Sequence, residues 1–216
     1  MTDVEIKKSV TDELSWLPYL NDTKIGVAVK DGIVMLSGEV DSYPEKLQAE
    51  HAVRRVRGVA ALAEELTVSG KWQGPGDLDI ARDATQALER AVNVPEGVVA
   101  ATVHDHVITL SGELSWQFQR EAAARAVRYV KGVTGVRNVI VLRSVASAVG
   151  IRTAIVAALA RSAELDGRSV TVHASDEGLV RLEGAVRTRH EREAAERAAW
   201  LARGVTAVVN DLDVRP

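Results

Sequence analysis

One pattern occurs three times in this chain of 216 residues. In each copy an alternating apolar run ends at a glycine, and a second glycine follows twenty residues later. The pairs are Gly38 and Gly58, Gly112 and Gly132, and Gly184 and Gly204. A fixed internal distance indicates one structural unit copied in tandem. These six glycines form no phosphate-binding motif. We therefore interpret them as structural residues, at positions where the backbone needs a conformation that glycine adopts easily.

The repeats divide the chain into three domains, which we place at residues 1–69, 77–143 and 147–216. A domain of this size buries a small core and is only marginally stable alone. The third copy has one extra residue where K-D-G and H-D-H become S-D-E-G. We expect this insertion to lie in a turn, because exposed turns tolerate added residues.

Each copy opens with a helix pattern and continues with a hairpin pattern. Thr2 and Glu5 have capping-box spacing, and apolar residues from Ile6 to Leu14 then recur at helical intervals. The spacing predicts a helix of about twelve residues that ends near Trp16. Apolar residues recur at every second position over residues 25–40, on both sides of an Asp-Gly pair, and this pattern predicts a β-hairpin.

A second helix and a last strand complete each copy. Pro44 opens the second helix of copy one. We expect each second helix to end with a basic residue in its last turn, and the glycine that follows to form its left-handed cap. The last strand alternates, with one polar residue on the apolar face: Glu64, Asn138 or Asn210. Such a residue needs a hydrogen-bond partner, which we expect to be local backbone.

These patterns predict an α+β fold of three tandem αββαβ sandwiches. Each would have a three-stranded mixed sheet with two helices on one face. The second strand, second helix and third strand form a crossover unit. Whether the third strand pairs with the first or the second is left open by the sequence pattern.

The hairpin I-G-V-A-V-K-D-G-I-V-M-L-S-G-E-V and the strand R-G-V-A-A-L-A-E-E-L-T-V carry a family resemblance. With G-V-T-G-V-R-N-V-I-V-L and G-V-T-A-V-V-N-D-L-D-V, they make the chain resemble a bacterial protein with three BON domains, a family named for osmotically inducible and nodulation proteins. The resemblance implies an αββαβ fold and a non-enzymatic role in binding phospholipid or supporting the envelope under osmotic stress. Glu64 and His106 depart from the family's asparagine and turn glycine.

Composition narrows the location and the partners. Cysteine is absent, so no disulfide or thiolate site exists. The first residues lack the apolar core of a signal peptide, and we expect a cytoplasmic protein, although relatives are often periplasmic. No apolar run is long enough for a transmembrane segment. The net charge is −3, and no repeat is basic enough for nucleic acid to be an expected partner.

No group of residues predicts catalysis. His104, Asp105 and His106 are ordinary metal-ligand types, but neighbours in a tight turn do not converge on one ion, and we interpret them as a solvated turn. No nucleophile motif is present. We therefore expect no enzyme activity, no metal and no cofactor.

Two features could contact a partner or a membrane. Trp16, Leu17 and Tyr19 lie in a short segment that either enters a lipid interface or a partner's groove, or covers the end of the core. The other feature is the basic face of each second helix, which could attract anionic headgroups. Ion pairs such as Glu50 with Arg54 would neutralise these faces. The candidate contact residues are Trp16, Leu17, Tyr19, Trp72, Arg128, Lys131 and Arg203.

The sequence supports a non-catalytic binding protein that contacts anionic phospholipid or envelope components in osmotic or general stress. The alternative is a soluble scaffold or a holdase-like protein-interaction module, which an exposed apolar patch would favour. A weaker third hypothesis is a sensor of small ions or solutes. Ligand identity and oligomeric state are not given by these patterns.

Overall fold

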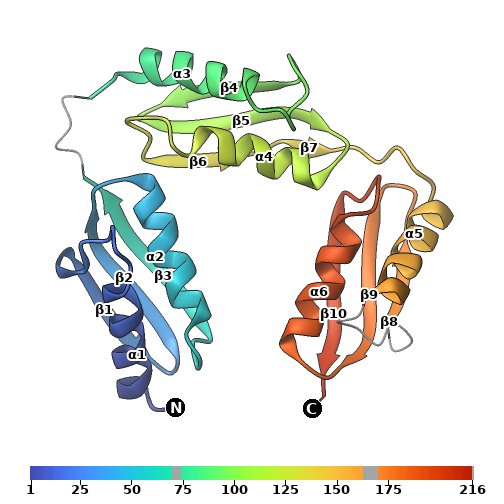
Figure 1. Ribbon diagram of the computed structural model, residues 1–216, viewed down its shortest axis with the longest axis horizontal. Helices are drawn as coiled ribbons and strands as arrows, with labels where there is room; N and C mark the ends of the chain where they lie inside the picture. Colours follow the sequence, from blue (N-terminus) through green and yellow to red (C-terminus); the bar gives the residue numbers. More distant parts are fainter. Residues whose placement is uncertain (70–73, 163–169, 216) are drawn as a thin grey trace. The chain divides into compact units, whose positions relative to one another are not determined.

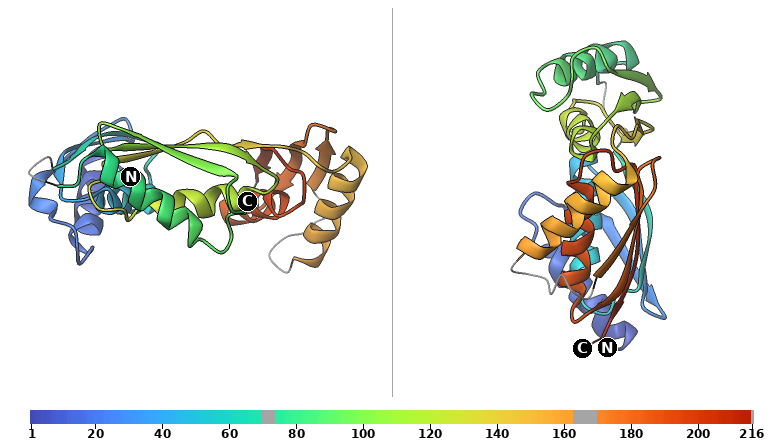
Figure 2. Two further views of the ribbon diagram at one scale, coloured as in Figure 1. Left: turned by 90° about the horizontal axis from the view of Figure 1, so that it is seen from above. Right: turned by 90° about the vertical axis from the view of Figure 1, so that its right-hand side faces the viewer.

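The computed structural model describes residues 1–69, 74–162 and 170–215, and Trp72 lies outside them. Each repeat contains a helix, a β-hairpin, a second helix and a last strand (Figure 1). The predicted α+β class and the three αββαβ units are confirmed. The two further views of Figure 2 show the helices of the third repeat on one side of its sheet.

The first repeat begins with α1 and ends with β3. Its elements are α1 (Asp3–Ser15), a 3-10 turn η1 (Asp22–Lys24), β1 (Ile25–Lys30), β2 (Ile33–Val40), α2 (Tyr43–Arg55) and β3 (Ala61–Val68). The predicted capping box is present: the Thr2 hydroxyl accepts from the Glu5 N–H, and the Glu5 carboxylate accepts from the Thr2 N–H. The Ser42 hydroxyl caps α2, which has proline in its first turn.

The second and third repeats follow the same order. The second contains α3 (Asp77–Glu89), β4 (Val99–His104), β5 (Val107–Leu114), α4 (Gln117–Val127), β6 (Gly135–Asn138) and β7 (Val141–Leu142). The third contains α5 (Ala148–Arg161), β8 (Val170–Ala174), β9 (Leu179–Val186), α6 (Arg189–Trp200) and β10 (Ala207–Val214). The single last strand expected in the second repeat is divided into β6 and β7, which both pair with β5.

The sheet topology resolves the question that the sequence left open. The strand orders are β1-β2-β3, β4-β5-β6 and β10-β9-β8. In the first and third repeats the hairpin strands are antiparallel, and the last strand runs parallel to the second strand. The second strand is therefore central, and the first strand forms a sheet edge.

The first helix of each repeat packs its predicted apolar face into the core. Buried residues recur at helical spacing in all three: Ile6, Val10 and Leu14; Ile80, Ala84 and Leu88; Ile151, Ile155 and Leu159. Burying a leucine or isoleucine side chain stabilises the fold by about 1.5–3 kcal/mol. The core-facing positions of the second helices are mainly alanine, with valine added in the first two repeats.

The polar residue on the inner face of the last strand bonds local backbone, as predicted. Asn138 accepts from the Ile140 N–H at 3.2 Å and donates to the Arg120 carbonyl at 2.9 Å. Asn210 likewise accepts from the Leu212 N–H and donates to the Arg192 carbonyl. Each asparagine thus connects its strand to the second helix of its repeat.

An aspartate joins the first helix to the hairpin turn, a contact that the sequence analysis missed. The Asp3 carboxylate accepts from the N–H groups of Asp31 and Gly32 at 2.8 and 3.0 Å. In the second repeat, Asp77 accepts from Asp105 and His106, both at 3.0 Å. The two aspartates occupy the same position, at the start of the first helix.

The third repeat makes this connection in the opposite direction. Alanine stands at the corresponding position of its first helix, and Asp176 in the hairpin turn supplies the carboxylate. That carboxylate accepts from the Ala148 N–H at 2.8 Å. An aspartate in the turn therefore satisfies a free N–H group at the start of α5.

The expected role of three glycines is wrong in one respect. The second helices end at Arg55, Val127 and Trp200, before the basic residue and the glycine. Gly58, Gly132 and Gly204 instead have positive φ in the turn that leads to the last strand. The first helix packs closely there, because a Cβ on Gly58 would lie 3.2 Å from the Ile6 side chain.

Candidate binding surfaces

The segment after α1 divides its residues between the core and the solvent. Leu17 packs against the core of the first repeat, and Leu20 is buried. Trp16 is 85% exposed and Tyr19 is 81% exposed. Backbone bonds from the Leu17 N–H to the Leu14 carbonyl, and from the Leu20 N–H to the Leu17 carbonyl, hold the segment in two turns. Leucine side chains therefore cover the end of the core, whereas Trp16 does not contribute to this cover. Contact of the two exposed rings with a partner or a membrane stays a prediction.

Some cations of the first repeat are neutralised, and others are not. Lys24 contacts Asp41 at 2.8 Å, and this hydrogen bond raises the pKa of the Lys24 ammonium. Arg55 pairs with Glu13 at 2.8 Å. Lys7 on α1 is exposed and forms no ion pair within the described part of the chain, and the same holds for Lys8. These two ammonium groups are available to an anionic partner.

The other candidate contact residues lie in the turns that follow α4 and α6. Arg128 is half-buried and has no ion pair among residues 1–69, 74–162 and 170–215. Lys131 and Arg203 are exposed. The structure brings Trp16, Leu17 and Tyr19 together in one loop, whereas these three basic residues belong to the second and third repeats.

Two of the ion pairs predicted on the second helices are present. Arg54 lies 3.5 Å from Glu50, and Arg125 lies 3.6 Å from Glu121. In the third repeat, Glu193 lies 3.7 Å from Arg189. Exposed pairs of this kind stabilise a helix only weakly, by about 0.3–0.5 kcal/mol. Their main effect is to lower the positive charge that these faces present.

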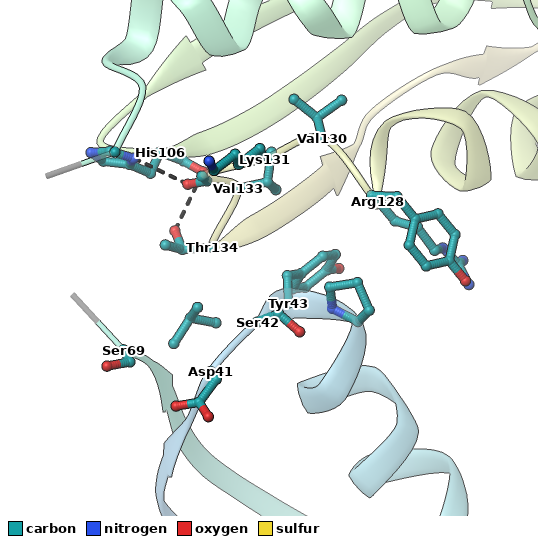
Figure 3. A pocket seen from close by; sticks show the side chains of 15 residues that line it. Asp41, Ser42, Tyr43, Ser69, His106, Arg128, Val130, Lys131, Val133 and Thr134 are labelled. Atoms are coloured by element: carbon teal, nitrogen blue, oxygen red, sulfur yellow. Dashed lines mark hydrogen bonds between the residues drawn. The ribbon is translucent and has the colours of Figure 1, made fainter. Parts of the chain in front are cut away.

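The histidine-containing turn holds its side chains in separate contacts. His104 Nδ1 lies 3.1 Å from an Asp105 carboxylate oxygen. The His106 ring instead lies 3.1 Å from the Gly132 carbonyl, and the Thr134 hydroxyl donates to the His106 carbonyl (Figure 3). Within the described residues, no three His, Cys, Asp or Glu side chains gather as metal ligands. His106 has a φ of 65°, so the turn keeps its shape without glycine.

A groove in the third repeat was not predicted. Its volume is about 720 Å³, and it lies between α5 and β8. Lining residues come from one stripe of α5 and four consecutive residues of β8: Ala148, Val149, Arg152, Thr153, Val156, Ala157, Ala160 and residues 171–174. The sequence held a signal for it, since α5 has apolar residues on more than the face that enters the core.

Among the helices in the described ranges, none combines the length and the apolarity that a membrane span requires.

Known proteins match the chain at the level of family and sequence. The BON domain model matches residues 2–70, 76–144 and 147–216. Osmotically-inducible protein Y of Escherichia coli (strain K12) is 29% identical over 143 residues, which cover 64% of this chain and 71% of that protein.

Two solved structures of CdsD, a structural protein of the type III secretion system of Chlamydia trachomatis, also align with the chain. Both have 13% identity and a TM-score of 0.28. One alignment covers 98% of this chain and 93% of that chain, and the other, to a C-terminal domain, covers 100% of both. A TM-score this low supports no argument about fold or function. The family model, by contrast, matches nearly the whole sequence in three copies, and the chain therefore belongs to the BON domain family.

Proposed function

We propose that the chain is a non-catalytic binding protein that contacts anionic phospholipid or envelope components during osmotic or general stress. Membership of the BON family supports this proposal. So does the similarity to a relative whose name describes it as osmotically inducible.

One observation carries the lipid assignment: the outward aromatic pair of Trp16 and Tyr19. Indole and phenol rings have an apolar body and one polar group, which suits the boundary between headgroups and acyl chains. Leu17 and Leu20 fix the segment to the core from beneath. Insertion of the two rings therefore requires little ordering of the backbone, and less conformational entropy opposes binding.

The unpaired cations add a weak electrostatic attraction. A lysine or arginine near an anionic leaflet contributes about 1 kcal/mol. Lys7 and Lys8 lie on α1, which ends just before the aromatic pair, and Arg128 and Arg203 offer further charges in other repeats. With a chain charge of −3, we expect binding to be modest and to weaken as salt screens the surface.

Co-sedimentation with vesicles tests the proposal. The full chain should pellet with phosphatidylglycerol vesicles at low salt and remain largely soluble with phosphatidylcholine vesicles. In the double variant Trp16→Ser, Tyr19→Ser, most of the protein that pelleted as wild type should stay in the supernatant. Val92→Ser is the matched control, since Val92 is fully exposed in the corresponding loop of the second repeat. Wild-type protein that stays in the supernatant would refute the proposal.

A second candidate function is a protein-interaction scaffold or holdase. The observation that favours it is the apolar groove between α5 and β8. Light scattering of a heat-unfolded client protein tests the holdase form: the chain should slow aggregation in proportion to its concentration. An unchanged aggregation rate at molar excess would exclude that form.

A further inference from the structure

Helix α5 presents two apolar faces, and the core uses only one. Ile151, Ile155 and Leu159 are buried against the sheet. A second stripe lines the groove at intervals of three and one residues: Val149, Arg152, Thr153, Val156, Ala157 and Ala160. Val149 is 74% exposed and Val156 is 44% exposed. A helix that is apolar on both faces usually contacts another element on each.

Strand β8 forms the opposite wall of the groove and is a sheet edge. In the described part of the chain it pairs only with β9. Four consecutive β8 residues line the groove, so the wall is the edge of the strand as well as its inner side. An unpaired strand edge is a template for another extended segment.

The backbone pattern identifies the free groups of this edge. The Ser175 N–H donates to the Leu179 carbonyl, so residues 175 and 179 form a hydrogen-bonded pair. Such pairs alternate along an antiparallel ladder, which directs the backbone groups of Thr171 and His173 toward β9. The N–H and C=O groups of Val172 and Ala174 then point away from β9, toward the open edge.

The corresponding stripe differs in the other repeats. In α1 it consists of Val4, Lys7, Lys8, Thr11, Asp12 and Ser15. In α3 it consists of Leu78, Ala81, Arg82, Thr85, Gln86 and Glu89. Both sets are mainly polar, whereas the α5 stripe has one charged residue. The apolar stripe is therefore a property of the third repeat and not a requirement of the repeat fold.

Arg152 indicates the charge of the occupant. It is exposed, lines the groove and has no ion pair among the described residues. Among the described residues that line the groove, none is acidic. In a two-fold dimer built on this groove the surface would face itself, so a second copy would offer Arg152 no carboxylate from it. Charge complementarity instead favours a different chain that carries an acidic residue.

We propose that the groove between α5 and β8 binds an extended acidic-apolar peptide segment of another protein. The segment pairs with the Val172 and Ala174 backbone as an added strand. Its alternate side chains pack against Val149 and Val156, and one carboxylate reaches Arg152. This site goes beyond the proposed lipid contact and is independent of Trp16 and Tyr19.

Fluorescence polarisation with two seven-residue peptides tests the proposal on the full chain. In the probe Glu-Thr-Val-Thr-Val-Thr-Glu, the first, third, fifth and seventh side chains face the groove. Glutamate stands at both ends of this set, so a carboxylate reaches Arg152 whichever direction the added strand runs. The control probe has lysine in place of both glutamates. We expect the glutamate peptide to bind at least tenfold more tightly, and Arg152→Glu to reverse this order.

Variants of the helix stripe separate the groove from a general effect. Val156→Glu should weaken the glutamate peptide at least tenfold, and its exposed position leaves the core intact. Thr11→Glu is the matched control, because Thr11 occupies the same position in α1, and it should change nothing. In amide spectra, the wild-type signals of Val172 and Ala174 should move on binding.

Several results would overturn the proposal. One is equal affinity for the two peptides, and another is binding that Arg152→Glu and Val156→Glu leave unchanged. A wild-type dimer that Val156→Glu dissociates would assign the groove to a second copy. Vesicle binding lost in Val156→Glu without any peptide binding would assign it to lipid. The double variant Trp16→Ser, Tyr19→Ser should retain peptide binding, which keeps this test separate from that of the proposed lipid contact.

Discussion

Lys46 and Glu64 form an ion pair, 3.1 Å from Nζ to Oε2, at the position where the other repeats use an asparagine. Glu64 accepts from the Leu66 N–H, as Asn138 and Asn210 do from the residue two places on. A carboxylate cannot donate to the second helix, however. Lys46 supplies the donor instead, both to Glu64 and to the Leu66 carbonyl at 2.8 Å.

Glu64→Ala should destabilise the first repeat by about 1–3 kcal/mol, since it leaves a half-buried N–H without its acceptor. Glu64→Asn should cost less, because the amide can accept from Leu66 and donate to the Lys46 carbonyl. Hydrogen exchange at the Leu66 amide measures both effects in the full chain. Equal acceleration in the two variants would show that the backbone bond is not the stabilising contact.

Asp3→Ala should destabilise the first hairpin by about 1–2 kcal/mol, because it removes one acceptor from two backbone N–H groups. The Asp31 and Gly32 amides should exchange faster with solvent. Asp12→Ala, on the same helix, is the control and should leave these amides unchanged. Protection that survives the Asp3 substitution would contradict the role of this carboxylate.

Gly112→Ala should destabilise the second repeat by about 2–4 kcal/mol, through backbone strain and overpacking. Gly112 has a φ of 141°, and its Cβ would meet the Val98 carbonyl. Gly97→Ala is the matched comparison: its φ is 72°, but nothing lies within 4 Å of an added Cβ. That change should cost about 1–2 kcal/mol from φ alone. Urea unfolding monitored by amide exchange compares them, and equal costs would exclude the close contact.

The capping box of α1 predicts a pH dependence. Hydrogen bonds from the Thr2 backbone N–H and hydroxyl lower the pKa of the Glu5 carboxyl. A carboxylate whose pKa is lower in the folded state stabilises that state above its unfolded pKa, and the effect is lost as pH falls through the folded pKa. The difference in stability between wild type and Glu5→Gln should therefore shrink on acidification. A difference that stays constant into the acid range would contradict this assignment.

The fold was predictable because the local sequence patterns indicate the same helices and strands that bury the core residues. Capping, helical spacing and strand alternation all indicated the same elements, as in Ile6 to Leu14. The strand order was not predictable, because parallel pairing of β3 with β2 depends on contacts between residues distant in the sequence. Asp3 was missed for a similar reason: it has no local hydrogen-bond pattern, and its partners lie 28 and 29 residues away.

The candidate surfaces were only partly predictable. The aromatic residues after α1 were evident, but the sequence could not assign Leu17 inward and Tyr19 outward, because the loop has no regular period. The groove in the third repeat had a signal in the composition of α5. Identifying it required knowing that β8 is an edge strand, which depends on the sheet order.

The emission of Trp16 on phosphatidylglycerol vesicles reports whether its indole enters the lipid interface. In a variant with Trp72, Trp116 and Trp200 replaced by phenylalanine, Trp16 is the sole reporter. We predict a blue shift on vesicles and quenching by brominated acyl chains, both reduced by high salt. Emission that remains that of a fully hydrated indole, at lipid concentrations that pellet the protein, would contradict entry of Trp16 into the interface.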